Sequence, residues 1–231
     1  MQGAKNSILS PAELAPYIDH TLLKPEASEA DIARLCDEAI QHRFKAVCVN
    51  PIHVRFCAER LQGSAVLIAS VIGFPLGASL ARVKALEAEG AVRDGAAEID
   101  MVMRIDLARA GRFNEVEADI AAAVAGASGA NVKVILETGL LTPEQIVSAC
   151  QASERAGASF VKTATGFLGR GATLEDIQLM KKSCSPRMQI KASGGVKTFE
   201  QAKALIEAGA HRIGTSNGVA LVTGGATSPG Y

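Results

Sequence analysis

The chain lacks tryptophan altogether, has only two tyrosines in 231 residues, and carries no excess charge of either sign. Lysine and arginine number 24, and so do aspartate and glutamate, so the composition offers no basic surface for nucleic acid or an anionic membrane. No stretch approaches the ~18 consecutive apolar residues of a spanning helix. The opening residues 1–6 (MQGAKN) show no secretory signal. We therefore expect a soluble, cytoplasmic protein that binds neither nucleic acid nor membranes.

Cysteine and histidine are also sparse. The cysteines are odd in number and scattered, which is typical of reduced thiols rather than of a disulfide framework. They are Cys36, Cys48, Cys57, Cys150 and Cys184. The histidines show no i, i+2 or i+4 pairing, and no Cys-x-x-Cys occurs, which disfavours a metal-dependent enzyme. They are His20, His42, His53 and His211. We predict neither a metal nor another cofactor.

The chain does contain a regular alternation of strand and helix patterns. The expected strands are 18–23, 46–49, 66–72, 98–103, 132–137, 160–162, 188–193 and 211–216. Their continuous apolar runs are typical of parallel strands covered on both faces. Eight such units in one chain of this length predict a single α/β domain, a (β/α)8 TIM barrel with a short N-terminal helix at 10–14. An open, doubly wound sheet is the alternative. The domain is expected to span 1–222, followed by a flexible tail, 223–231.

Polar side chains share one face of several of these strands. Glu98 and Asp100 alternate with apolar neighbours, and so do Lys133 and Glu137. The apolar faces pack against the helices, so the polar faces must point to the barrel axis, where ionised groups are costly unless they are paired. We expect a site there that is built from four strands by Asp100, Glu137, Lys162 and Lys191.

Lys162 ends its strand just before the segment 163–166 (TATG), where a strand opens into a pocket. A lysine attacks a carbonyl group only when it is neutral, and burial together with a second ammonium group, here Lys191, lowers its pKa. Asp100 is placed to carry a proton while a carbinolamine loses water. Two structural interpretations remain at this point. Lys162 could extend to solvent at a strand end, or a buried Lys–Asp–Lys network could only hold the barrel together.

Glycine-rich segments follow the last two expected strands. Gly194 and Gly195 come after the seventh strand, and the segment 214–218 (GTSNG) belongs to the end of the eighth. Barrel proteins often bind phosphate with backbone N–H groups at these two positions. The sequence therefore predicts a phosphate site beside the two lysines.

These segments together resemble the deoxyribose-phosphate aldolase family, which consists of class I aldolases. The matching segments occur in order, one at nearly every strand, over almost the whole chain. They are 18–25 (IDHTLLKP), 46–51 (AVCVNP), 71–77 (VIGFPLG), 98–102 (EIDMV), 133–138 (KVILET), 160–167 (FVKTATGF), 191–195 (KASGG) and 212–216 (RIGTS). The resemblance implies a (β/α)8 barrel that reversibly cleaves 2-deoxy-D-ribose 5-phosphate to acetaldehyde and D-glyceraldehyde 3-phosphate.

The resemblance also implies roles for individual residues. Lys162 would carry the Schiff base, and Asp100 and Lys191 would transfer protons. The substrate pocket would include Asp19, Thr21 and Thr165, and the phosphate site would include Gly194, Gly195 and Ser216. The partners would be small sugar phosphate and aldehyde substrates, and the chain would form a homo-oligomer, either a dimer or a tetramer.

Two positions depart from the family pattern: Ala164 stands where serine is usual, and Asn217 replaces a common second serine of the phosphate site. Phe167, just after the Thr165-Gly166 pair, offers no charge to a phosphate. The chain ends on Tyr231, as some family members do, and we expect its phenol to assist proton removal from the acetaldehyde methyl carbon. The alternative is a terminus without a role. A catalytically silent barrel that senses sugar phosphates is the competing functional hypothesis.

Overall fold

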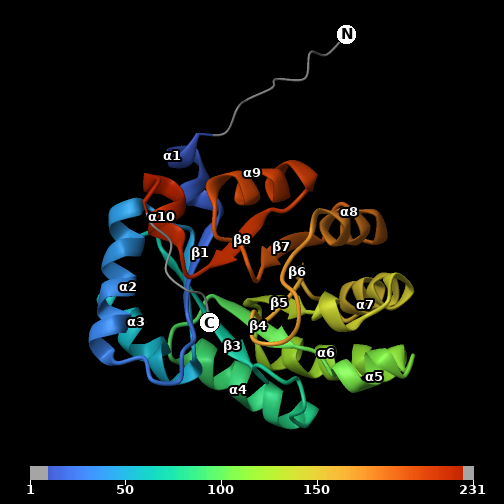
Figure 1. Ribbon diagram of the computed structural model, residues 1–231. Coiled ribbons are helices and arrows are strands. Elements are labelled where there is room, and N and C mark those ends of the chain that lie inside the picture. Colours follow the sequence, from blue (N-terminus) through green and yellow to red (C-terminus); the bar gives the residue numbers. More distant parts are fainter. Residues whose placement is uncertain (1–9, 226–231) are drawn as a thin grey trace.

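A closed barrel of parallel strands forms the centre of the computed structural model, which describes residues 10–225 (Figure 1). The strands pair in chain order, and β8 pairs back onto β1 through Ile213 and Ile18. Their bounds are β1 Ile18–Leu22, β2 Ala46–Val49, β3 Leu67–Ile72, β4 Glu98–Val102, β5 Asn131–Ile135, β6 Phe160–Lys162, β7 Gln189–Ser193 and β8 Arg212–Thr215. The predicted (β/α)8 barrel is confirmed, and its closure excludes the open sheet.

Helices alternate with the strands and surround the barrel (Figure 1). The main helices are α2 Glu29–His42, α3 Val54–Arg60, α4 Ala81–Arg93, α6 Phe113–Gly126, α7 Pro143–Arg155, α8 Leu174–Ser183 and α9 Phe199–Ala208. Hydroxyl side chains cap several of them, because the first N–H groups of a helix lack partners within it. Ser28, Thr142 and Thr198 each accept such an N–H group. No helix between residues 10 and 225 is long and apolar enough to cross a membrane.

Shorter elements complete the fold. The predicted N-terminal helix is α1 Pro11–Leu14, where the Ser10 backbone N–H and hydroxyl both donate to Glu13. The remaining elements are α5 Ile105–Arg109, α10 Gly218–Thr223 and the 3-10 helices η1 Ala15–Tyr17, η2 Pro51–His53 and η3 Thr138–Leu140. The sequence did not indicate α10, which has six residues and no side-chain cap. Thr223, the first residue of the predicted tail, is the last residue of α10, and 226–231 lie outside the described residues.

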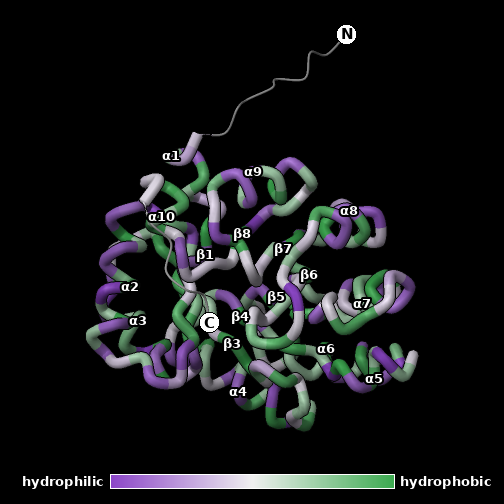
Figure 2. Tube along the Cα trace, viewed as in Figure 1, coloured by the Kyte–Doolittle hydropathy of each residue, from purple (hydrophilic) through white to green (hydrophobic). Residues whose placement is uncertain are grey.

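The two faces of the strands have opposite characters. Side chains such as Ile99, Met101, Val134 and Ile190 are buried in the large apolar core between strands and helices. Along the helices of the outer ring, hydrophobic and hydrophilic segments alternate, as expected for amphipathic helices with one face on the barrel (Figure 2). The opposite strand faces point to the barrel axis and carry the charged residues. This arrangement places the predicted polar faces inside the barrel.

Candidate active site

Asp100 is the centre of a buried group of charges inside the barrel. Its Oδ2 accepts hydrogen bonds from the ammonium groups of Lys162 and Lys191, each at 2.7 Å, and its Oδ1 accepts one from Lys133 at 2.8 Å. The strand register explains the arrangement, because Lys162 on β6 pairs beside Lys191 on β7, and Asp100 on β4 pairs beside Lys133 on β5. The structure thus brings together three residues that the sequence predicted as one site, Asp100, Lys162 and Lys191.

A second layer of charges lies against the first. Lys133 contacts Glu98 at 2.7 Å, and Arg212 donates two hydrogen bonds to the same carboxylate, at 3.0 and 2.7 Å. Asp19 lies 2.5 Å from Lys191 and accepts a hydrogen bond from Arg212 Nε at 2.7 Å. Asp19 therefore sits beneath the site and holds Lys191. Sequence analysis placed Glu98 and Lys133 on inward faces but assigned neither of them, nor Arg212, to the site.

The contacts around the three lysines are unequal. Lys133 and Lys191 each lie within hydrogen-bond distance of two carboxylates. Among the described residues, Lys162 lies within that distance of one carboxylate, Asp100. Burial lowers the pKa of Lys162, whereas the carboxylate of Asp100 raises it. The nearby ammonium group of Lys191 lowers this pKa further, and the net shift is downward. For Lys191, burial is outweighed by Asp100 and Asp19, and its pKa is raised. Lys162 is therefore the lysine that gives up its proton more easily.

The carboxyl group of Asp100 remains ionised. Burial alone would raise its pKa, but Lys133, Lys162 and Lys191 together hold it well below its ordinary value. Cys48 also reaches this group, with its Sγ 3.9 Å from Asp100 Oδ2. Burial and the neighbouring carboxylate raise the pKa of the Cys48 thiol, which keeps it protonated at neutral pH.

Glu137 lies apart from the ammonium groups and holds a loop. Its Oε2 accepts hydrogen bonds from the Thr165 hydroxyl at 2.6 Å and from the Thr165 backbone N–H at 3.2 Å. The Thr165 hydroxyl oxygen in turn accepts the Phe167 N–H at 3.1 Å. Glu137 has a left-handed backbone (φ 54°), and burial raises the pKa of its carboxyl group despite the Thr165 hydrogen bonds. This arrangement fixes the loop that follows Lys162.

The predicted phosphate loops line a common cavity of about 370 Å³. Gly194 and Gly195 from the β7 loop meet Gly171 from the β6 loop and Ser216 after β8. The two loops approach so closely that a Cβ on Gly171 would lie 2.0 Å from the Gly194 carbonyl oxygen. Lys197 contributes a positively charged side chain to the lining, a residue that sequence analysis did not assign. Backbone N–H groups, a hydroxyl and an ammonium together suit an anion.

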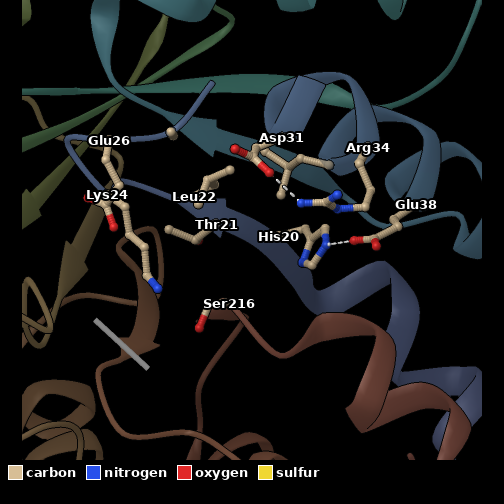
Figure 3. Close-up of a pocket in the computed structure, with 11 residues that line it drawn as sticks. His20, Thr21, Leu22, Lys24, Glu26, Asp31, Arg34, Glu38 and Ser216 are labelled. Carbon is tan, nitrogen blue, oxygen red and sulfur yellow. Dashed lines mark hydrogen bonds and ion pairs between the residues drawn. The ribbon is translucent and has the colours of Figure 1, made fainter. Parts of the chain in front are cut away.

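A second cavity, of about 540 Å³, adjoins the first at Ser216 (Figure 3). Thr21 and Lys24, at and just after the end of β1, line it on one side. On the other side α2 supplies Glu38, which bonds His20 Nε2 at 2.7 Å (Figure 3). The Thr21 hydroxyl donates to the Asp19 carbonyl oxygen at 2.9 Å. Thr21, predicted for the substrate pocket, and Ser216, predicted for the phosphate site, therefore border one space next to the glycine-rich loops. The whole arrangement lies at the carboxyl ends of the strands.

Comparison with known proteins agrees with this geometry. A family model described as the DeoC/LacD family aldolase matches residues 14–223. The chain belongs to this aldolase family. The aldolase is 52% identical to a deoxyribose-phosphate aldolase of Staphylococcus epidermidis, over 91% of this chain and 96% of that protein. It is also 52% identical to one of Streptococcus sanguinis, over 95% of this chain and all of that protein.

Solved structures show the same relationship. The aldolase superposes with a TM-score of 0.86 on a tetrameric deoxyribose phosphate aldolase from Aeropyrum pernix, at 35% identity, covering 92% of this chain and 91% of that one. It superposes with a TM-score of 0.87 on an aldolase called QR15, at 40% identity, covering 91% and 94%. The resemblance stated from sequence segments is confirmed, and the chain is an aldolase.

Two further expectations concern groups around the site. Among the residues that the structure describes, no three histidine, cysteine, aspartate or glutamate side chains are grouped so that they could hold a metal ion. Phe167, which offers no charge, packs edge-on against Phe74 with ring centroids 5.2 Å apart. Tyr231 lies outside the described residues.

Proposed function

We propose that this aldolase reversibly cleaves 2-deoxy-D-ribose 5-phosphate to acetaldehyde and D-glyceraldehyde 3-phosphate through a Schiff base on Lys162. The observation that carries the proposal is the unequal pairing of the lysines. Lys162 is 3% exposed, touches one carboxylate, and has a lowered pKa. A buried lysine with a lowered pKa is the amine that attacks a carbonyl carbon. The names of the close relatives supply the substrate.

The reaction proceeds in steps that the residues around Lys162 support. The neutral Nζ adds to the aldehyde carbon C1, and loss of water from the carbinolamine gives the imine. The C3 hydroxyl then loses its proton, the C2–C3 bond breaks, and its electrons form an enamine at C1–C2. D-glyceraldehyde 3-phosphate leaves. Protonation of C2 and hydrolysis of the new imine release acetaldehyde and restore the amine.

Asp100 and Lys191 are the proposed proton-transfer pair. Asp100 contacts both ammonium nitrogens through one oxygen, so a proton can pass between the two lysines over two short hydrogen bonds. Its low pKa means that it holds a proton only briefly and acts as a relay. Asp19 fixes Lys191 from below and acts through it as a positioning residue.

The remaining predicted residues are proposed to bind the sugar phosphate. The phosphate group would lie on the backbone of Gly194 and Gly195, with Ser216 and Lys197 at the sides of the cavity. Thr21 and Thr165 would contact the sugar. The cavity is held by bonds between loops: the Ala172 N–H donates to the Gly194 carbonyl at 3.1 Å. A preformed cavity of this kind orients the substrate toward Lys162.

Reductive trapping tests the proposal. The protein is incubated with acetaldehyde and borohydride, and the modified peptide is mapped by mass spectrometry. We expect a permanent ethyl group on Lys162 and none in Lys162→Ala. An adduct on Lys191 would contradict the assignment. Absence of any adduct, with sugar phosphate binding retained, would support a catalytically silent sensor instead.

We also propose that the enzyme is a homo-oligomer, a dimer or a tetramer, which acts in the cytoplasm. Large apolar side chains are exposed around α4, with Leu86 at 65% and the preceding Leu76 at 60%, and Ile52 in η2 at 84%. η2 and α4 are in contact, and we propose that a second copy covers these exposed apolar side chains. The solved relative from Aeropyrum pernix is tetrameric. Light scattering on the purified protein measures the oligomeric state.

The proposed cytoplasmic location is supported by the cysteines. All five, each within 10–225, are free thiols, which fits a reducing compartment.

A further inference from the structure

A cavity of about 710 Å³ lies at the opposite end of the barrel from Lys162. We call it the basal cavity. Its lining consists of residues that precede or begin strands, together with the ends of α8 and α9. Lys45 immediately precedes β2, His211 immediately precedes β8, and Lys181 lies in the last turn of α8. These residues define the amino-terminal face of the barrel, where the proposed aldol reaction uses no group.

The charge of the basal cavity is of one sign. Its lining contains Lys45, Lys181 and Arg212 but, among the described residues, no carboxylate. The chain as a whole is balanced at 24 charges of each sign, so the excess is local. The Arg212 guanidinium is paired inward with Asp19 and Glu98. Within residues 10–225, no carboxylate forms an ion pair with Lys45 or Lys181, so neither ammonium group has an acidic partner in this part of the chain.

Two further features prepare the cavity for an anion. His211 Nδ1 accepts the Ile190 backbone N–H at 3.1 Å, which assigns the hydrogen of the neutral ring to Nε2 and makes that atom a donor. The stem of Lys181 lies across Gly209: a Cβ there would be 2.5 Å from Lys181 Cδ, and Gly209 has φ +125°. Glycine thus leaves room for the lysine to lie over the cavity. Burial and Lys181 lower the pKa of His211, so at neutral pH the ring is uncharged.

We propose that the basal cavity binds the phosphate group of a small-molecule anion through Lys45, Lys181 and His211 Nε2–H. The three residues come from three separate segments of the chain and line the same cavity. A tetrahedral phosphate, whose oxygens face several ways, suits such donors better than a planar carboxylate. The proposal concerns a second site and does not depend on the proposed aldol reaction.

Titration with inorganic pyrophosphate, followed by NMR of the histidine ring C–H signals, tests this inference. The chain has four histidines, and loss of one signal in His211→Asn assigns His211. We expect a saturable shift of that signal and a raised pKa of His211, because a bound anion stabilises the imidazolium form. Sodium chloride at the same ionic strength is the reference for simple screening.

Variants separate the basal cavity from the cavity beside Lys162. Lys45→Gln combined with Lys181→Gln should raise the Kd for pyrophosphate at the His211 signal at least tenfold. Lys182→Gln, a change at the neighbouring position on α8, and Lys197→Gln, in the other cavity, should leave it unchanged. The inference is overturned if the double variant, shown by circular dichroism to be folded, binds as wild type does. It is also overturned if chloride reproduces the shift, or if the shift does not saturate.

Discussion

Replacing Lys191 by methionine is expected to raise the pKa of Lys162 and to move the onset of catalysis to higher pH. Both ammonium nitrogens lie 2.7 Å from Asp100 Oδ2, so they are no farther apart than twice that distance. Two like charges about 5 Å apart repel by about 3 kcal/mol at the effective dielectric constant of about 20 that suits buried sites. Since one pKa unit corresponds to ~1.4 kcal/mol, this repulsion is worth up to about two pH units. Loss of Lys191 also frees Asp100 to attract Lys162 more strongly, which acts in the same direction.

The assay is the rate of borohydride trapping with acetaldehyde, measured across the neutral and alkaline range. Only the neutral amine attacks the aldehyde, so the trapping rate follows the deprotonation of Lys162. The inflection should rise by about one to two pH units in Lys191→Met. Lys191→Arg keeps a cation at the same place and should keep the inflection near that of wild type. Lys197→Met lies outside the charge network and serves as a second control.

An inflection that stays at the wild-type pH while the rate falls would refute the electrostatic role and leave Lys191 as a proton-transfer group only. Folding is checked by circular dichroism, and Asp19 keeps Arg212 as its partner in the variant. Glu98→Gln gives a test of opposite sign. It removes a carboxylate from Lys133 and Arg212, increases the positive charge near Lys162, and should move the inflection to lower pH.

Other variants test other parts of the proposed site. Asp100→Asn keeps the shape and removes the relay, so kcat should fall by at least ~100-fold while KM changes little; a loss within about threefold would contradict the relay. Gly195 has φ +72° and open space where a Cβ would stand, so Gly195→Val should raise KM for the phosphorylated sugar more than for deoxyribose; equal effects would place the phosphate elsewhere. Glu137→Ala should raise KM by freeing the Thr165 loop, whereas Glu137→Gln, which still accepts the Thr165 hydroxyl, should keep KM near the wild-type value. A KM that is also raised in Glu137→Gln would show that the negative charge of Glu137, and not its hydrogen bond, is needed. Tyr231→Phe should slow deuterium exchange into acetaldehyde without preventing trapping, and unchanged exchange would leave Tyr231 without a role.

The barrel and its polar interior could be predicted because both follow from local patterns. Apolar runs with turn residues between them mark buried parallel strands, and two-residue alternation identified the inward faces of Glu98 and Asp100. The end of β5 could not be located in this way. Its apolar and polar alternation continues to Glu137, but the strand ends at Ile135, and Glu137 turns into a left-handed conformation. Its carboxyl group therefore binds the Thr165 loop rather than an ammonium group.

The second layer of charges depended on information that local patterns do not contain. Arg212 joins Asp19 and Glu98, which are 193 and 114 residues away in sequence, and this pairing requires β8 to close onto β1. The departure at Ala164 has a simple explanation in the structure. Its backbone carbonyl accepts the Ser193 hydroxyl at 2.6 Å, so the contact between the two loops needs no side chain at position 164.

The network also gives the physical reason for proposing Lys162, and not one of its neighbours, as the reactive amine. Among the described residues, four cations and three carboxylates are joined by direct contacts in the barrel. Lys133 and Lys191 each contact two carboxylates. For Lys191, Asp100 and Asp19 outweigh burial and raise its pKa, and Arg212 stays charged at any pH of interest. Lys162 has one carboxylate, which it shares with both other lysines. Of the two lysines that share Asp100 Oδ2, Lys162 is the one whose pKa is lowered, and it stands at the end of β6, where the loop cavities begin.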